Sequence, residues 1–157
     1  MRPRALGLVR RPRIGIAVAA AAGLWLLAEV VAHLQETVVG PNPQLLTLID
    51  ASHPSLTNLA IEVVVEGGFV GFAEELFFRA VLFAALRQRM PFVAAAALSS
   101  AIFAATHGLG AFVPIFVVGF GLAALYERRN SLWTNALAHA TFNTISAVAI
   151  YLVATRG

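Results

Sequence analysis

The stretch that decides the fold reads VVVEGGFVGFAEELFFRAVLFAAL over residues 63–86. Most of its side chains are apolar, yet it carries two adjacent glutamates, Glu74 and Glu75, and one arginine, Arg79. A charged side chain at the centre of a membrane helix opposes insertion by roughly 2.5–3.5 kcal/mol, so three unpaired charges would oppose it by roughly 8–10 kcal/mol. We therefore expect the three to be paired, hydrated, or both, and we expect function to be the reason for their presence.

The composition indicates that lipid surrounds this chain. Of 157 residues, 59% are hydrophobic and 12% are charged, against roughly 25% charged in a soluble domain. The apolar residues form long runs, which predicts one compact helical membrane domain. The absence of cysteine excludes a disulfide, a thiolate nucleophile and a Cys-based metal site. The net charge of +3 rests on arginine alone and indicates membrane orientation rather than nucleic-acid binding.

The predicted fold class is all-α, a polytopic membrane bundle of about five transmembrane helices. The five predicted spans are residues 14–39, 55–89, 91–107, 111–126 and 132–154. A helix needs about 20 residues to cross the hydrocarbon core. The first run is also longer than the apolar core of a signal peptide, which has about 7–15 residues, so we expect it to be retained. A short connection over residues 44–54 is expected to face away from the cytoplasm.

The second predicted span is longer than the membrane core, since 34 residues of helix extend about 51 Å. The helix is therefore expected to tilt, protrude or break. Three glycines, Gly67, Gly68 and Gly71, mark the expected break, and they equally suit close contact with a neighbouring helix. At its start, Ser55 or Thr57 is expected to cap the helix.

Arginines mark one end of the predicted bundle. Residues 1–13 hold five arginines and no apolar period, so we expect a basic cytoplasmic tail there. Four more arginines fall in turns on the same side: Arg87, Arg89, Arg128 and Arg129. The positive-inside rule thus favours a cytoplasmic N-terminus. The arginine-only basic set hints at a GC-rich bacterial genome, so the expected location is a bacterial inner membrane.

Four polar side chains from three predicted helices are expected to share one depth. Counting 1.5 Å per residue from the cytoplasmic turns places Glu74 at about 20 Å, His107 at about 24 Å, His139 at about 13 Å and Asn143 at about 20 Å. Taken singly, each has a simpler explanation: a protonated buried carboxyl, an interfacial histidine, or hydrogen bonds between helices. Their convergence favours a common site.

The two glutamates are expected to do different work. Glu75 and Arg79 are four residues apart, in the order that favours an ion pair within one helix, and we interpret them as a structural pair at the site. Glu74 is rotated by about 100° from Glu75 and is free for chemistry. Two other glutamates, Glu62 and Glu66, are expected to be solvated near the far interface.

Three motifs resemble those of the CPBP intramembrane proteases, also called the abortive-infection family. EELFFR from Glu74 to Arg79 resembles the EExxxR motif, FAATH from Phe103 to His107 the FxxxH motif, and HATFN from His139 to Asn143 the HxxxN motif. That family includes the Ras-converting CAAX prenyl endopeptidases and the bacteriocin-processing or immunity proteins. The resemblance assigns residues 55–155 to a protease core and leaves the first helix, 14–39, outside the motifs. Ala80 stands where a glycine is common.

The resemblance implies an intramembrane endopeptidase that hydrolyses a membrane-associated substrate, a prenylated CAAX protein or a leader peptide. It implies Glu74 as the base that activates water, His107 as its partner, and His139 with Asn143 as oxyanion donors. It also implies that no cofactor is needed. A zinc site formed by Glu74, His107 and His139 is the open alternative, since two histidines and a carboxylate are zinc ligands.

Two other classes of function remain open at this stage. The first is a non-catalytic immunity or scaffold protein whose polar site binds a peptide or packs helices. The second is a proton-coupled carrier, which the lack of an inverted repeat disfavours. The expected partners are the lipid bilayer and a membrane-associated peptide or protein, with no nucleic acid. The oligomeric state is left open.

Overall fold

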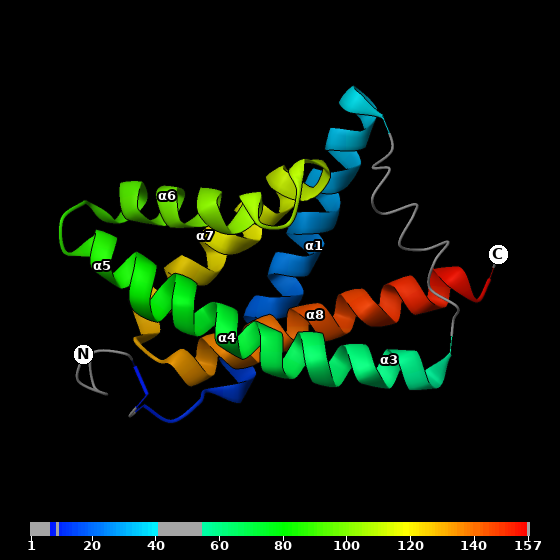
Figure 1. Ribbon diagram of the computed structural model, residues 1–157, viewed down its shortest axis with the longest axis horizontal. Helices are drawn as coiled ribbons and strands as arrows, with labels where there is room; N and C mark the ends of the chain where they lie inside the picture. The colour runs from blue at the N-terminus through cyan, green and yellow to red at the C-terminus, as the bar shows by residue number, and fades with distance from the viewer. Residues whose placement is uncertain (1–6, 9, 41–54, 157) are drawn as a thin grey trace.

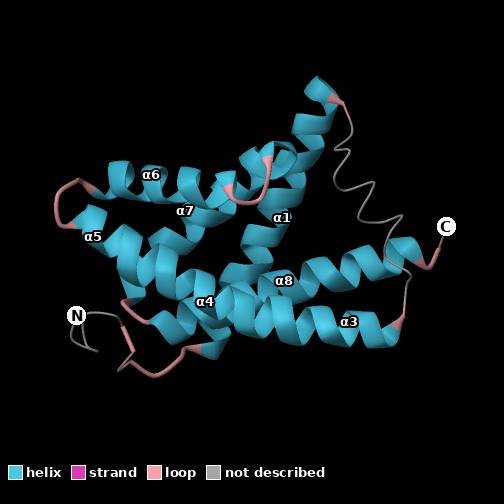
Figure 2. Cartoon of the chain, viewed as in Figure 1, coloured by secondary structure: helices cyan, strands magenta, loops and turns pink. Residues whose placement is uncertain are grey.

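The computed structural model describes residues 7, 8, 10–40 and 55–156. Within these residues every regular element is helical and no strand is present (Figure 2). The elements are α1 (Ile14–Val39), α3 (Leu56–Glu62), η1 (Val63–Val70), α4 (Gly71–Glu75), η2 (Leu76–Phe83), α5 (Ala84–Arg87), α6 (Phe92–Ala105), η3 (Leu109–Ala111), α7 (Phe112–Arg129) and α8 (Leu132–Ala154). The all-α prediction is confirmed. The predicted connection over residues 44–54 lies outside the described residues.

Helical segments occupy all five predicted spans. Three are long and apolar enough to cross a membrane: α1, the run Leu109–Arg129 and α8. The fourth, α6, has 14 residues and extends about 21 Å. The fifth is the series from α3 to α5, which forms one continuous helical path (Figure 1). The orientation of the bundle in a membrane stays a prediction.

The long second helix does not break at its glycines, since Gly71 keeps right-handed helical dihedral angles, so the break is absent and tilt or protrusion is the alternative that remains. Val63 and Leu76, at the junctions of its segments, keep right-handed helical dihedral angles. The backbone is instead wound as a π-helix in η1 and η2, on either side of α4. Such wide turns are rare and are frequently found at functional sites. Ser55 caps the start, accepting a hydrogen bond from Asn58 N at 3.0 Å.

The glycines of this helix bring it close to α8, so the alternative expectation of close contact is confirmed. A Cβ atom on Gly67 would lie 3.4 Å from both Ala140 O and Thr144 Oγ1. A Cβ atom on Gly71 would lie 3.7 Å from Cγ of His139. Small residues at such a contact let two helix backbones approach each other. They also place α4 directly against the helix that carries His139.

The first helix crosses the others obliquely and packs on α7 and α8 (Figure 1). Its buried face carries small side chains, Ala17, Ala21 and Ala28, with Leu24 packed beside them. Leu24 fills the space left by Gly121, where a Cβ atom would overlap it. The first helix, although it carries none of the motifs, is therefore packed into the core of the bundle.

The turns rich in arginine lie at one end of the bundle. Figure 1 shows the α5–α6 turn, the α7–α8 turn and the start of the described chain toward this end, with the start of α3 and the end of α8 opposite. Residues 7 and 8 are hydrogen-bonded to the α7–α8 turn: Leu132 N donates to Gly7 O at 3.2 Å, and Trp133 Nε1 donates to Leu8 O at 3.1 Å. The described part of the predicted tail is therefore docked on the bundle.

Candidate active site

The second glutamate of the pair, Glu75, lies at the centre of a buried polar network. Its side chain is 0% exposed and forms an ion pair with Arg79 at 3.3 Å. It also accepts hydrogen bonds from Asn135 Nδ2 at 2.9 Å and from His139 Nδ1 at 2.9 Å. These contacts supply the pairing that a buried carboxylate requires. The predicted ion pair between Glu75 and Arg79 is present within one helix.

The guanidinium group of Arg79 is enclosed by backbone and aromatic rings. Its Nη2 donates to Gly119 O at 3.2 Å, and its Cζ lies 4.6 Å from the ring centroid of Phe103 and 5.9 Å from that of Phe78. Aromatic faces attract a guanidinium cation. Arg79 thus joins α7 and α6 to the helix that carries the glutamates.

The first glutamate, Glu74, faces both predicted histidines. Its side chain is 22% exposed, with Oε1 3.7 Å from His107 Nε2 and Oε2 3.6 Å from His139 Nε2. Separations of this length are too wide for direct hydrogen bonds, and a small polar molecule can bridge them. The three residues come from three elements: α4, the turn after α6, and α8. The fold therefore brings Glu74, His107 and His139 together, as the sequence predicted.

Each histidine is oriented by an acceptor at its Nδ1 atom. His139 Nδ1 lies 2.9 Å from Glu75 Oε1, and His107 Nδ1 lies 2.9 Å from Phe103 O. A carboxylate and a carbonyl oxygen can only accept, so both Nδ1 atoms carry protons. The α6 helix ends at Ala105, and His107 is held in the following turn before Gly108, whose φ of 86° redirects the chain. Both Nε2 atoms are consequently left facing Glu74.

A cavity of about 500 Å³ opens beside these groups. Its polar lining includes Glu74, His107, His139 and Asn143, and its walls include Phe103, Ile115 and Phe142. Asn143 does not touch the other three polar side chains within hydrogen-bond distance; its Nδ2 donates to Glu66 O in η1 at 3.0 Å. The fourth predicted site residue therefore shares the cavity with Glu74 and lies one helical turn from His139.

Sequence reasoning missed several residues that belong to this site. Glu62 and Glu66 line the same cavity, and Glu66 is exposed, which agrees with the expectation that it is solvated. Asn135, which is 0% exposed, holds Glu75 and donates to Leu122 O at 2.8 Å. Its position four residues before His139 places it on the same face of α8, which is the signal that could have found it.

The zinc alternative requires three ligands arranged around one point. Within the described ranges, no group of three or more His, Asp or Glu side chains has an arrangement that could hold a metal ion. The Nε2 atoms of both histidines face the Glu74 carboxylate.

The fold and the site define a helical membrane protein with a cavity lined by glutamate and histidine. The family model for type II CAAX prenyl endopeptidase Rce1-like proteins matches residues 56–145, and the chain belongs to this family. This result confirms the resemblance found in the three motifs.

One curated relative was found by sequence comparison. The protein named "Putative membrane peptidase YdiL" from Bacillus subtilis (strain 168) is 32% identical over 88 residues, which cover 55% of this chain and 36% of the relative. The matched region thus spans about a third of the relative's length. No solved structure matches this chain.

Proposed function

We propose that this chain is an intramembrane endopeptidase that hydrolyses a peptide bond with water activated by Glu74. The observation that carries the proposal is the position of the Glu74 carboxylate, 3.6 Å and 3.7 Å from Nε2 of two histidines at the edge of a cavity. Membership of the Rce1-like family supports the same reaction class.

In the proposed reaction, Glu74 accepts a proton from water, and the resulting hydroxide attacks the carbonyl carbon of the substrate. The Nε2 lone pair of His107 accepts the second water hydrogen and orients the nucleophile, since the Nδ1 atom of that ring is bonded to Phe103 O. When the C–N bond breaks, Glu74 returns its proton to the leaving amine. One carboxylate thereby acts first as base and then as acid.

The developing oxyanion needs donors at hydrogen-bond distance. In the proposal, His139 donates from Nε2 in its imidazolium form, which the Glu75 carboxylate at Nδ1 supports. Asn143 supplies an amide N–H from the next turn of α8, leaving its other N–H on Glu66 O. The two donors project from one helix into the cavity that also receives Glu74.

The proposed substrate is a membrane-associated peptide or protein. The apolar walls of the cavity and its place among membrane-length helices support a substrate that arrives from the lipid. A prenylated CAAX protein and a leader peptide are both candidates, and a bacterial inner membrane is the proposed location.

The decisive experiment compares membranes from cells that produce the wild-type protein or its Glu74→Gln variant. We expect peptide termini that appear only with the wild type, and a loss of rate of at least about 100-fold in the variant. Glu29→Gln on α1 is the matched control and should retain activity. Thermal unfolding in detergent should be equal for all three proteins.

Full activity in Glu74→Gln would overturn the mechanism. A cellular phenotype that survives Glu74→Gln, His107→Ala and His139→Ala together would favour a non-catalytic immunity or scaffold role.

A further inference from the structure

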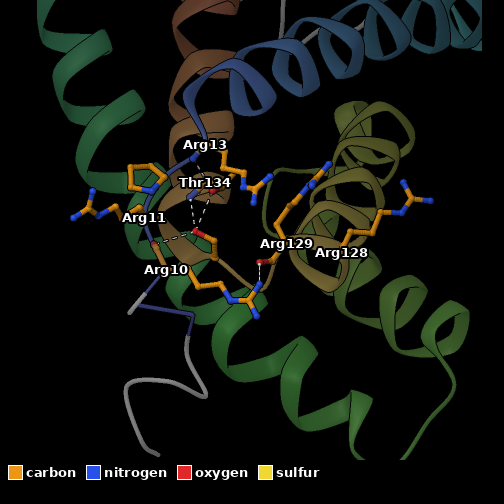
Figure 3. Close-up of a pocket in the computed structure, with 8 residues that line it drawn as sticks. Arg10, Arg11, Arg13, Arg128, Arg129 and Thr134 are labelled. Atoms are coloured by element: carbon orange, nitrogen blue, oxygen red, sulfur yellow. Dashed lines mark hydrogen bonds between the residues drawn. The ribbon is translucent and has the colours of Figure 1, made fainter.

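A second pocket, of about 410 Å³, lies where the residues before α1 meet the α7–α8 turn (Figure 3). Its lining contains five arginines: Arg10, Arg11, Arg13, Arg128 and Arg129. None of the five forms an ion pair with a carboxylate among the described residues. The nearby acidic residue at the end of α7, Glu127, is bound to Arg87 at 3.0 Å. The pocket therefore concentrates positive charge without a counter-charge of its own.

Hydrogen bonds from three segments build this pocket. Arg10 Nη1 donates to Arg129 O at 3.1 Å, and Arg13 N donates to Thr134 Oγ1 at 3.1 Å. Ser131 Oγ donates to Arg10 O at 3.4 Å. The backbone that positions the arginines is thus fixed before any ligand arrives.

Arg10 uses one guanidinium N–H on Arg129 O, and its other N–H groups remain available. The Nε atom of Arg129 is buried and has no hydrogen-bond partner among the described residues. In Figure 3, Arg11 and Arg128 extend to opposite sides of the pocket. A planar guanidinium offers paired N–H groups that match the oxygens of a phosphate.

The position of the pocket indicates what kind of anion it meets. It lies between the start of α1, the end of α7 and the start of α8, which are the three helices long and apolar enough to cross a membrane. Trp133, the neighbour in sequence of the lining residue Thr134, is exposed and donates its indole N–H to Leu8 O, and tryptophan is enriched at the level of lipid headgroups. Basic pockets between membrane helices at the cytoplasmic side suit anionic lipid headgroups.

We propose that this pocket binds the headgroup of an anionic phospholipid, with Arg10, Arg13 and Arg129 on its phosphate and Arg11 and Arg128 at the rim. The site is separate from the Glu74 cavity, and the proposal is independent of peptidase activity. A bound lipid would tie the docked segment before α1 to the α7–α8 turn.

The test uses the detergent-solubilised full chain carrying Trp25→Phe, so that Trp133 reports on the pocket by fluorescence. The probe is dihexanoyl phosphatidylglycerol. We expect saturable binding that Arg13→Gln and Arg129→Gln each weaken by about fivefold or more. Arg89→Gln, the same change in an exposed arginine at the same end of the bundle, should leave the affinity unchanged. If either pocket variant fails to fold, the double variant Arg11→Gln/Arg128→Gln should show the same loss.

Four outcomes would overturn the proposal. An equal loss in Arg89→Gln would indicate diffuse charge attraction. Equal affinity for dihexanoyl phosphatidylcholine would remove the requirement for an anionic lipid. Inorganic phosphate that competes at the same concentration as the lipid would indicate a site for free anions. Displacement of the lipid by an acidic peptide at lower concentration would indicate a protein partner.

Discussion

The Nδ1 atom of His139 lies 2.9 Å from Oε1 of Glu75, so the predicted structural glutamate also orients a predicted site histidine. This contact joins α8 to α4 inside the bundle. It places the proton on Nδ1 and turns Nε2 toward Glu74. Of the two adjacent glutamates, Glu75 accepts a hydrogen bond from Nδ1 of this ring and Glu74 faces its Nε2 atom.

Glu75→Gln should change the protonation pattern of that ring. The neutral glutamine amide replaces the carboxylate that, in the proposed reaction, supports the imidazolium form of His139, so the ring should lose one of its two N–H donors. We expect kcat to fall by about 10–100-fold with little change in KM, which is the usual effect of removing a residue that orients a functional histidine. The ¹⁵N NMR signals of His139, assigned with a His139→Gln variant, should change as well. Unchanged signals together with full activity would contradict this role.

Asn135→Ala should destabilise the fold more than an ordinary polar substitution does. The variant leaves Leu122 O and one oxygen of Glu75 without their shared donor. The expected loss in the free energy of unfolding is about 1–3 kcal/mol, measured by denaturation in detergent. Thr141→Ala is the control, since that hydroxyl bonds only Leu137 O of its own helix. Equal losses in the two variants would argue against the network.

Two adjacent glycines offer a matched test of the contact between η1 and α8. A side chain on Gly67 meets Ala140 O and Thr144 Oγ1, whereas one on Gly68 meets nothing within 4 Å. Gly67→Leu should therefore lower stability by about 1–3 kcal/mol through overpacking, and Gly68→Leu should not. The cavity beside Glu74 would also change shape in the first variant, so activity should fall there alone. Identical unfolding curves for both variants would refute the close contact.

Metal removal tests the cofactor prediction. The proposed reaction uses Glu74 as base and protein groups as oxyanion donors, so exhaustive chelation should leave the rate unchanged. Metal content of the purified protein should be measured alongside. Loss of activity with 1,10-phenanthroline, restored by added zinc, would instead establish the zinc form with Glu74, His107 and His139 as ligands.

Gly7→Ala should release the segment before α1. Gly7 has a φ of 68°, and a Cβ atom there would lie 2.9 Å from Leu132 N. A strain of one to two kcal/mol shifts an equilibrium by about 5–30-fold, so trypsin should cleave after Arg10 faster by about that factor. Gly15→Ala, with open space around its Cβ, is the control. Equal cleavage rates would show that the segment is not held at Gly7.

The sequence alone was sufficient to predict the helical class and the meeting of Glu74, His107 and His139. Long apolar runs predict the helical class, and counted depths of about 13–24 Å place the three side chains in the middle of the bundle. Depth does not define rotation about each helix axis, so the partner of Asn143 could not be predicted, whereas the four-residue spacing between Asn135 and His139 was an unused signal. The sequence did not predict that Glu62 and Glu66 line the same cavity as Glu74.

The π-helical winding of the second helix could not be predicted from the sequence either. Glycines at positions 67, 68 and 71 predicted either a break or a close contact, and the choice depends on what α8 presents to them. The docked segment before α1 was missed because its hydrogen bonds reach residues more than 100 positions away. Local patterns carry no signal for contacts of that range.

The spacing of the buried network along the chain bears on how the protein is made. Asn135 and His139, which bond Glu75, are synthesised 60 and 64 residues after it, and chains fold from the N-terminus during synthesis. The helix with Glu75 must therefore meet the lipid before these partners exist. Arg79, four residues away, is the only member of the network already present. Arg79 can thus pair with Glu75 while the helix inserts into the membrane, before α8 has been synthesised. A chain that lacks Arg79 should therefore insert this helix more slowly.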